Sequence, residues 1–489
     1  MAPVLQPIVG SYEARGYTLS CAGMQRDSLT ERVAEVEAKS ASFRRELGLL
    51  TLVLTQVMYI VGSGWVGTAA KLGPAHVAFW ALAILFYYLP QAAVVIYLNR
   101  LMPIEGGLYQ WASVGLGDFL GFLTAWNLWA YTVVIISVFG VIIATNLSYL
   151  LVHIGATFTG AAWYTPLVSA TAVVALTLVS LFGLRVGKWL QGLGGLAHLL
   201  TFGALILVPL VAAERGGDYR PLAAAMPSVT LLSLNIFGKL ALGALSGFEY
   251  VAILAGECRQ PERTIGRSVI AAAPIIAVMF ILGTSSVLAL VPLERIDLIS
   301  PIPQTLSVGF SGLALARFVV PALIALLLVR QIGTVTLLFA GNTRLPMVAG
   351  WDRLVPRWFT RLHPRYRTPQ NSILFVGALT LALTLAGQVG VGLQEAFQLL
   401  ENAAGILYAF TYLALFAIPL FGAARLGVRP PLWLRAAAAC GFGVAALYSV
   451  LSIFPIIEVA SWSAFAAKIL AVLVATEVAG IAIYRAGRR

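Results

Sequence analysis

The stretch VMYIVGSGWVGTAA, residues 57–70, is apolar enough to lie in a membrane, yet it carries Gly62, Gly64 and Gly67 within six residues. Glycine in a helix interior costs roughly 1 kcal/mol relative to alanine. Because Gly62, Ser63 and Gly64 are consecutive, they predict a local break near the middle of a hydrophobic helix rather than a stripe of small packing residues.

The composition places this stretch in a polytopic membrane protein. Of the 489 residues, 60% are hydrophobic and 11% are charged, whereas soluble domains have about 25% charged residues. Apolar runs near the roughly 20 residues that cross a bilayer recur along the chain. They predict an all-α protein with twelve transmembrane helices, near 47–70, 76–98, 118–152, 163–183, 189–213, 226–256, 268–292, 318–340, 371–390, 394–421, 433–455 and 462–484.

The net charge of +12 follows the topology of these spans. Most of the 32 Lys and Arg residues fall in the N-terminal tail, the C-terminus and alternate connections, which is the positive-inside bias. We therefore expect both termini in the cytoplasm, a multi-pass protein of a bacterial inner membrane surrounded by lipid, and no nucleic-acid partner. Residues 1–46 read as a cytoplasmic tail with an in-plane helix.

A second apolar stretch, LALGALSGFEY at residues 240–250, places Gly243, Ser246 and Gly247 near the middle of the sixth span. Five spans separate the two interrupted helices, so they occupy corresponding positions in two halves of opposite orientation. Paired interruptions of this kind point to a transporter site built on inverted repeats. The structural alternative is close helix packing through small residues.

Four motifs then resemble the amino acid–polyamine–organocation permeases. They are the Gly-Ser-Gly stretch, EGGLYQWA at 105–112, ALSGFEYVAILAGECRQPERTIGRS at 244–268 and TRLPMVAGWDRLVPRWFTRLHPRYRTPQNSI at 343–373, in the family's order. The resemblance implies a LeuT-type fold. Its parts are a first five-helix repeat at 47–213, an inverted second repeat at 226–421, broken helices 1 and 6, and two peripheral helices within 433–489.

The resemblance also implies a site for a zwitterionic amino acid at the two breaks. The substrate carboxylate would meet the amides and hydroxyl of Ser63 and Gly64, and its ammonium would meet backbone carbonyls of both spans. The residues expected to bind substrate are Ile60, Gly62, Ser63, Gly64, Trp65, Gly243, Ala244, Ser246 and Gly247.

Two of these positions depart from the family pattern. Gly243 stands where relatives often place a bulky aromatic that closes over the substrate, and Trp65 stands where a smaller aliphatic is common. One interpretation is that the aromatic has moved from one broken helix to the other. The alternative is a pocket larger than usual.

Coupling to ions is predicted from His198 and Glu249. The resemblance places His198 in the fifth span, where many bacterial relatives carry a Lys in the place of sodium. Histidine titrates near physiological pH, and an ionisable residue within a span is a functional candidate. We therefore expect the proton gradient, rather than sodium, to drive transport. The structural alternatives are a His bonded to a carbonyl and a Glu that caps a half-helix.

Further charges fall inside spans or in inner connections. Lys239, Arg330 and Glu401 suggest a site for an acidic side chain, the gate of an exchanger, or ion pairs, among themselves or with Glu249, that hold helices in register. Glu257, Arg263 and Arg344 suggest a cytoplasmic gate, although the positive-inside bias alone explains part of this charge.

The predicted function is a secondary active amino acid transporter working by alternating access, by proton symport. The alternatives are an amino acid exchanger, a carrier of polyamines or other organocations, and a nutrient sensor with a permease fold. No metal motif or catalytic arrangement is recognisable, so neither an enzyme nor a cofactor is expected. The sequence carries no signal for an oligomeric state.

Overall fold

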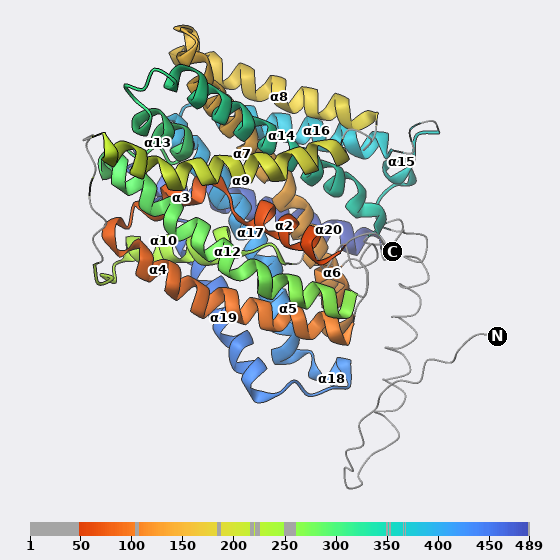
Figure 1. The fold of residues 1–489 in the computed structure, drawn as a ribbon. Helices are drawn as coiled ribbons and strands as arrows, with labels where there is room; N and C mark the ends of the chain where they lie inside the picture. The colour runs from red at the N-terminus through yellow and green to blue at the C-terminus, as the bar shows by residue number, and fades with distance from the viewer. Residues whose placement is uncertain are drawn as a thin grey trace, which may run out of the picture.

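The structure is a computed structural model that describes residues 48–102, 107–182, 187–215, 220, 225–248, 261–348, 351, 354–364, 366 and 368–487. Within these ranges every regular element is a helix. The helices lie side by side in one bundle, and segments from both halves of the sequence alternate across it (Figure 1).

The first half of the chain forms the helices expected there. The first span consists of two short helices bent by 50° at a break. The elements are α2 (Leu49–Ile60), α3 (Ser63–Ala70), η1 (Gly73–Ala75), α4 (His76–Ala83), η2 (Ile84–Tyr88), α5 (Leu89–Leu101), α6 (Leu108–Leu116), α7 (Asp118–His153), η3 (Phe158–Gly160), α8 (Tyr164–Leu181) and α9 (Gly187–Glu214).

The second half begins with α10, which continues directly into the π-helix η4. The elements are α10 (Leu231–Gly238), η4 (Lys239–Ala244), α12 (Pro261–Leu290), η6 (Leu293–Arg295), α13 (Pro301–Gly309), α14 (Ala316–Val348), α15 (Arg357–Thr360), α16 (Gln370–Ala386), α17 (Leu393–Phe421), α18 (Ala423–Leu426), α19 (Leu432–Leu451) and α20 (Trp462–Gly487).

The number of spans is confirmed in part. In the described residues, nine helices are long and apolar enough to cross a membrane, and the bent pair α2–α3 makes a tenth. The predicted spans at 226–256 and 371–390 correspond to the shorter apolar helices Leu231–Ala244 and Gln370–Ala386. The total of twelve and the division into two five-helix repeats therefore stay predictions.

Burial separates a central helix from peripheral ones. The 36-residue α7 would measure about 54 Å at 1.5 Å per residue, and 72% of its most apolar window is buried. The corresponding share is 17% for α8 and for α20. Helices α8 and α20 therefore lie at the edge of the bundle.

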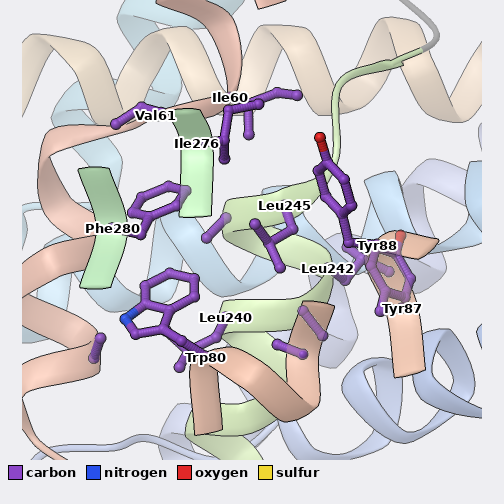
Figure 2. Close-up of a cluster of buried hydrophobic side chains, with 14 of the residues drawn as sticks. Ile60, Val61, Trp80, Tyr87, Tyr88, Leu240, Leu242, Leu245, Ile276 and Phe280 are labelled. Carbon is purple, nitrogen blue, oxygen red and sulfur yellow. The ribbon is translucent and has the colours of Figure 1, made fainter. Parts of the chain in front are cut away.

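A buried cluster of apolar side chains surrounds the ends of the interrupted helices (Figure 2). In this view Ile60 and Val61 lie at the top of the cluster, Leu245 lies near its middle, and Leu240 lies toward the bottom. Trp80 stacks on Phe280 with ring centroids 4.4 Å apart. The interrupted backbone is thus enclosed by protein, the condition under which irregular backbone is tolerated at membrane depth.

Candidate functional site

The first break lies where the Gly-Ser-Gly stretch predicts it. Helix α2 ends at Ile60, and α3 begins at Ser63 with no side chain capping its amides. Between them, the Gly62 amide donates to the Ile60 carbonyl over 2.8 Å. The first amides of α3 have no carbonyl within their own helix, so this end offers donors and a partial positive charge.

The second break follows η4 and lies at Ser246 and Gly247, both outside the helix. Gly247 has a φ of +134°, which L side chains rarely adopt, so this position requires glycine. Gly243 and Ala244 precede the break within η4. The predicted interruption is therefore confirmed, and its helical part is a π-turn, which is frequent at functional sites.

Side chains from two other helices hold the second break, and the sequence did not reveal them. The Gly247 amide donates to the Tyr412 hydroxyl over 3.0 Å, and the same oxygen accepts from Gln91 Nε2 over 2.9 Å. The Ser246 hydroxyl lies 2.9 Å from that of Tyr87. The hydroxyl of Tyr412 on α17 therefore accepts the hydrogen bond of the Gly247 amide, which the break leaves without a helical partner.

The two breaks meet at Trp65. A Cβ atom built on Gly243 would lie 2.5 Å from Cη2 of the Trp65 indole, and one built on Gly62 would lie 2.7 Å from its Cδ1. The indole thus lies between a glycine of each interrupted helix. This geometry agrees with the interpretation that the closing aromatic has moved from the sixth span to the first.

Arg330 on α14 binds the carbonyl end of α2. Its Nη2 donates to the Val61 carbonyl over 2.9 Å and to the Met58 carbonyl over 3.3 Å, and the residue is 5% exposed. The C-terminal end of a helix carries a partial negative charge, which a guanidinium stabilises. Arg330 therefore lies against backbone carbonyls. Its suggested pairing with Glu249 falls outside the described residues.

His198 on α9 lies fully buried, in contact with the Phe202 ring at a centroid distance of 4.7 Å. Neither ring nitrogen has a hydrogen-bond partner. The positive charge of Arg330 acts electrostatically on the His198 imidazole. Helices α9 and α14 pack closely, because a Cβ atom built on Gly194 of α9 would lie 3.7 Å from the Arg330 Cα. The structural alternative, a His198 bonded to a carbonyl, is therefore not found among the described residues.

Lys239, at the start of η4, lies fully buried and donates to the Asn402 side-chain carbonyl on α17. Glu401 precedes Asn402 in the same helix, and the opposite charges of Lys239 and Glu401 attract each other electrostatically. The two are not in direct contact as an ion pair. Asn402 instead holds the ammonium beside the carboxyl, a link that the sequence did not indicate.

The connection before α13 covers α3. A Cβ at Gly67 would lie 3.0 Å from Pro301 and 3.3 Å from the Asp297 carbonyl. The Asp297 carboxylate accepts from the Ile299 amide, from Gln394 on α17 and from Tyr149 on α7. Asp297 therefore fastens this connection against α3, another role that the sequence did not reveal.

The predicted cytoplasmic gate is described only in part. Arg263 on α12 is exposed and Arg344 on α14 is half-buried. Glu257 lies outside the described residues, as does Glu249, so the gate network stays a prediction.

Comparison with known proteins agrees with this geometry. The profile of the amino acid permease family matches residues 47–476. The chain is 27% identical to an uncharacterized transporter of Mycobacterium tuberculosis, over 71% of this chain and 75% of that protein. It is 24% identical to the methylthioribose transporter of Bacillus subtilis, over 76% and 83%, and 23% identical to the branched-chain amino acid permease BcaP of the same organism, over 78% and 85%. With its apolar helices and interrupted spans, the chain belongs to the amino acid permease family of integral membrane transporters.

Proposed function

We propose that this protein is a secondary active transporter that carries a zwitterionic amino acid across the membrane by alternating access. The observation that carries the proposal is the convergence of both interrupted helices on Trp65. The free amides of α3 can receive a carboxylate, while carbonyls near the break in the sixth span can receive an ammonium. Ile60, Ser63, Gly64, Ala244 and Ser246 supply these backbone and hydroxyl groups.

The proposal includes the topology that such a cycle needs. Two inverted five-helix repeats would rock around the breaks, with both termini on the cytoplasmic side of the inner membrane. Arg263, Arg344 and Glu257 would close the cytoplasmic side when the site faces outward.

We propose further that protons rather than sodium drive the transport. Freed carbonyls at the end of a half-helix attract cations. Here the Arg330 guanidinium already binds the carbonyls of Met58 and Val61. A fixed cation at this place supports a transporter that needs no sodium ion there.

His198 is the proposed proton carrier. In this conformation neither ring nitrogen of His198 has a hydrogen-bond partner, so the side chain is free to exchange a proton once water reaches it. The proton would then be loaded in a conformation where α9 and α14 separate enough to admit water. Glu249, just beyond the second break, is the other candidate.

The relatives' names favour amino acids as substrates and leave thiosugars as a second possible substrate class. BcaP is named for branched-chain amino acids, whereas the methylthioribose transporter is named for a thiosugar. A carrier of polyamines is disfavoured, because the Arg330 and Lys239 charges would repel a polycation.

A thermal-shift panel on the purified protein tests the substrate class. Binding to the native state stabilises it by about 2.7 kcal/mol at a ligand concentration of 100 Kd. We expect zwitterionic amino acids to raise Tm, and polyamines, nucleobases and the corresponding amino acid amides, which lack the carboxylate, to leave it unchanged. Stabilisation by the amides equal to that by the amino acids would contradict a carboxylate site at α3.

A further inference from the structure

A cavity of about 450 Å³ lies away from the two breaks, between α6, α7, α17, α19 and α20. Its walls are apolar, with Leu120, Leu123, Phe410 and Phe442 among the side chains that line it. Its volume falls within the range of small-molecule sites. None of the residues assigned to the transport site lines it.

Two polar side chains in the cavity have atoms without partners. Glu477 of α20 and Asn127 of α7 both line it and are neighbours, and the Asn127 Nδ2 donates to the Leu123 carbonyl over 3.0 Å. Glu477 Oε1 and Asn127 Oδ1 are buried and have no hydrogen-bond partner. Asn127 is 4% exposed, so its free acceptor is a buried polar atom in the lining of the cavity.

The cavity lies well inside the bundle's apolar depth. Tyr484 near the end of α20 contacts Phe119 and Phe122 near the start of α7, with ring centroids 5.1 and 5.2 Å apart, so these helix ends lie together. Glu477 is ten residues before the end of α20, which is about 15 Å along the helix. At such depth ionisable groups are rare and pair with a cation or mark a functional site.

The chemistry of the lining determines what would fit. Its unpartnered polar atoms, Glu477 Oε1 and Asn127 Oδ1, are acceptors. The Thr124 hydroxyl and the Asn127 amide already donate to backbone carbonyls of α7, and the lining includes no Lys or Arg. A ligand must therefore bring its own donors and positive charge, together with a hydrocarbon part for the leucine and phenylalanine walls. Because α20 lies at the edge of the bundle, the bilayer is the source from which such a molecule would enter.

We propose that this cavity binds an amphipathic amine from the bilayer, whose ammonium group donates to Glu477 Oε1 and Asn127 Oδ1 while its chain lies along α7 and α17. The site is independent of the transport site, and binding to it can be measured whether or not transport is detected.

The test uses the full chain in lipid nanodiscs with octylamine as the probe and octanol as its neutral match. We expect octylamine to raise Tm at concentrations where octanol does not. In Glu477→Gln the octylamine affinity should fall about tenfold, while Glu458→Gln, the same change at an exposed carboxyl outside the cavity, should leave it intact.

A second variant leaves Glu477 in place, so that the test does not depend on whether Glu477→Gln folds normally. Ala414→Phe fills the cavity from α17 without touching the carboxyl, and it should abolish the octylamine shift. The proposal is overturned if octanol stabilises the wild type as strongly as octylamine, which indicates hydrocarbon binding only, or if octylamine binding survives in either Glu477→Gln or Ala414→Phe.

Discussion

The end of the Trp65 indole approaches Gly243 so closely that a Cβ atom at residue 243 would lie 2.5 Å from its Cη2 atom. A glycine from each interrupted helix lies against the same indole, because a Cβ atom at Gly62 would lie 2.7 Å from Cδ1, at the other end of the ring system. The pair therefore links the two halves of the proposed site through one side chain.

Gly243→Ala should impair transport, because a Cβ atom at residue 243 would lie 2.5 Å from Cη2 of the Trp65 indole and would force the ring to shift. Overpacking of this kind costs about 1–3 kcal/mol. Uptake and Tm should both fall, whereas Gly203→Ala, in α9 where a Cβ meets nothing within 4 Å, should be neutral. In a Trp65→Leu background the cost of Gly243→Ala should disappear, since neighbouring residues couple. Equal costs in both backgrounds would show that the indole is not the obstacle.

Arg330→Met should destabilise the protein, because the carbonyls of Met58 and Val61 would lose their donor at membrane depth. Each buried group left unpaired costs about 1–3 kcal/mol. Thermal unfolding in detergent should show the loss. Arg317→Met, at the exposed start of the same helix, provides the control and should leave the unfolding temperature unchanged. Wild-type stability in Arg330→Met would mean that the guanidinium does not hold the end of α2.

His198→Ala should remove the effect of a proton gradient on uptake while substrate binding remains. The control is His76, the other fully buried histidine in the described ranges, whose nitrogens lie 2.9 Å from the Gly73 carbonyl and 3.0 Å from the Ser285 hydroxyl. His76→Ala should lower Tm without altering the response to the gradient. A gradient response that survives in His198→Ala would assign the proton elsewhere, with Glu249 next in line.

Tyr412→Phe should loosen the second break, because the Gly247 amide and Gln91 share its hydroxyl. Two buried donors would lose their acceptor, at about 1–3 kcal/mol each. Tyr88→Phe is the matched change, since the Tyr88 hydroxyl is buried without a partner, and it should cost nothing. Similar Tm values for the two variants would refute the proposed role of Tyr412.

Lys239 and Glu401 should behave as a coupled pair. Lys239→Met alone leaves the buried Glu401 carboxylate without the neighbouring positive charge, and an uncompensated buried charge is destabilising. Lys239→Met combined with Glu401→Gln should recover most of the loss, as measured by thermal unfolding. Additive costs would place the two charges in separate roles, with Lys239 free to meet an acidic substrate.

The sequence predicted the interrupted helices because closely spaced glycines in an apolar run weaken a continuous helix wherever it lies. It also singled out Trp65 and Gly243, because Trp65 is larger and Gly243 smaller than the residues common at these positions in the family. Arg330 could be recognised as a buried charge, but its acceptors could not. They are backbone carbonyls, which carry no sequence signature.

Tyr412, Gln91 and Asp297 were missed for a related reason. Tyrosine and glutamine within an apolar helix look like ordinary buried residues until another helix brings the Gly247 amide to them. Asp297 looks like one loop acid among several, although it fastens three segments. Such roles depend on which helices are neighbours, and that is decided by packing rather than by the local pattern.

The most direct measurement is uptake of radiolabelled amino acids into proteoliposomes of the wild-type protein, with proton and sodium gradients imposed separately. An inward proton gradient should accelerate the uptake of at least one amino acid, and replacing sodium by choline should change nothing. Uptake that requires sodium, or that ignores the proton gradient and depends only on amino acid inside the vesicle, would contradict the proposed proton-driven transport.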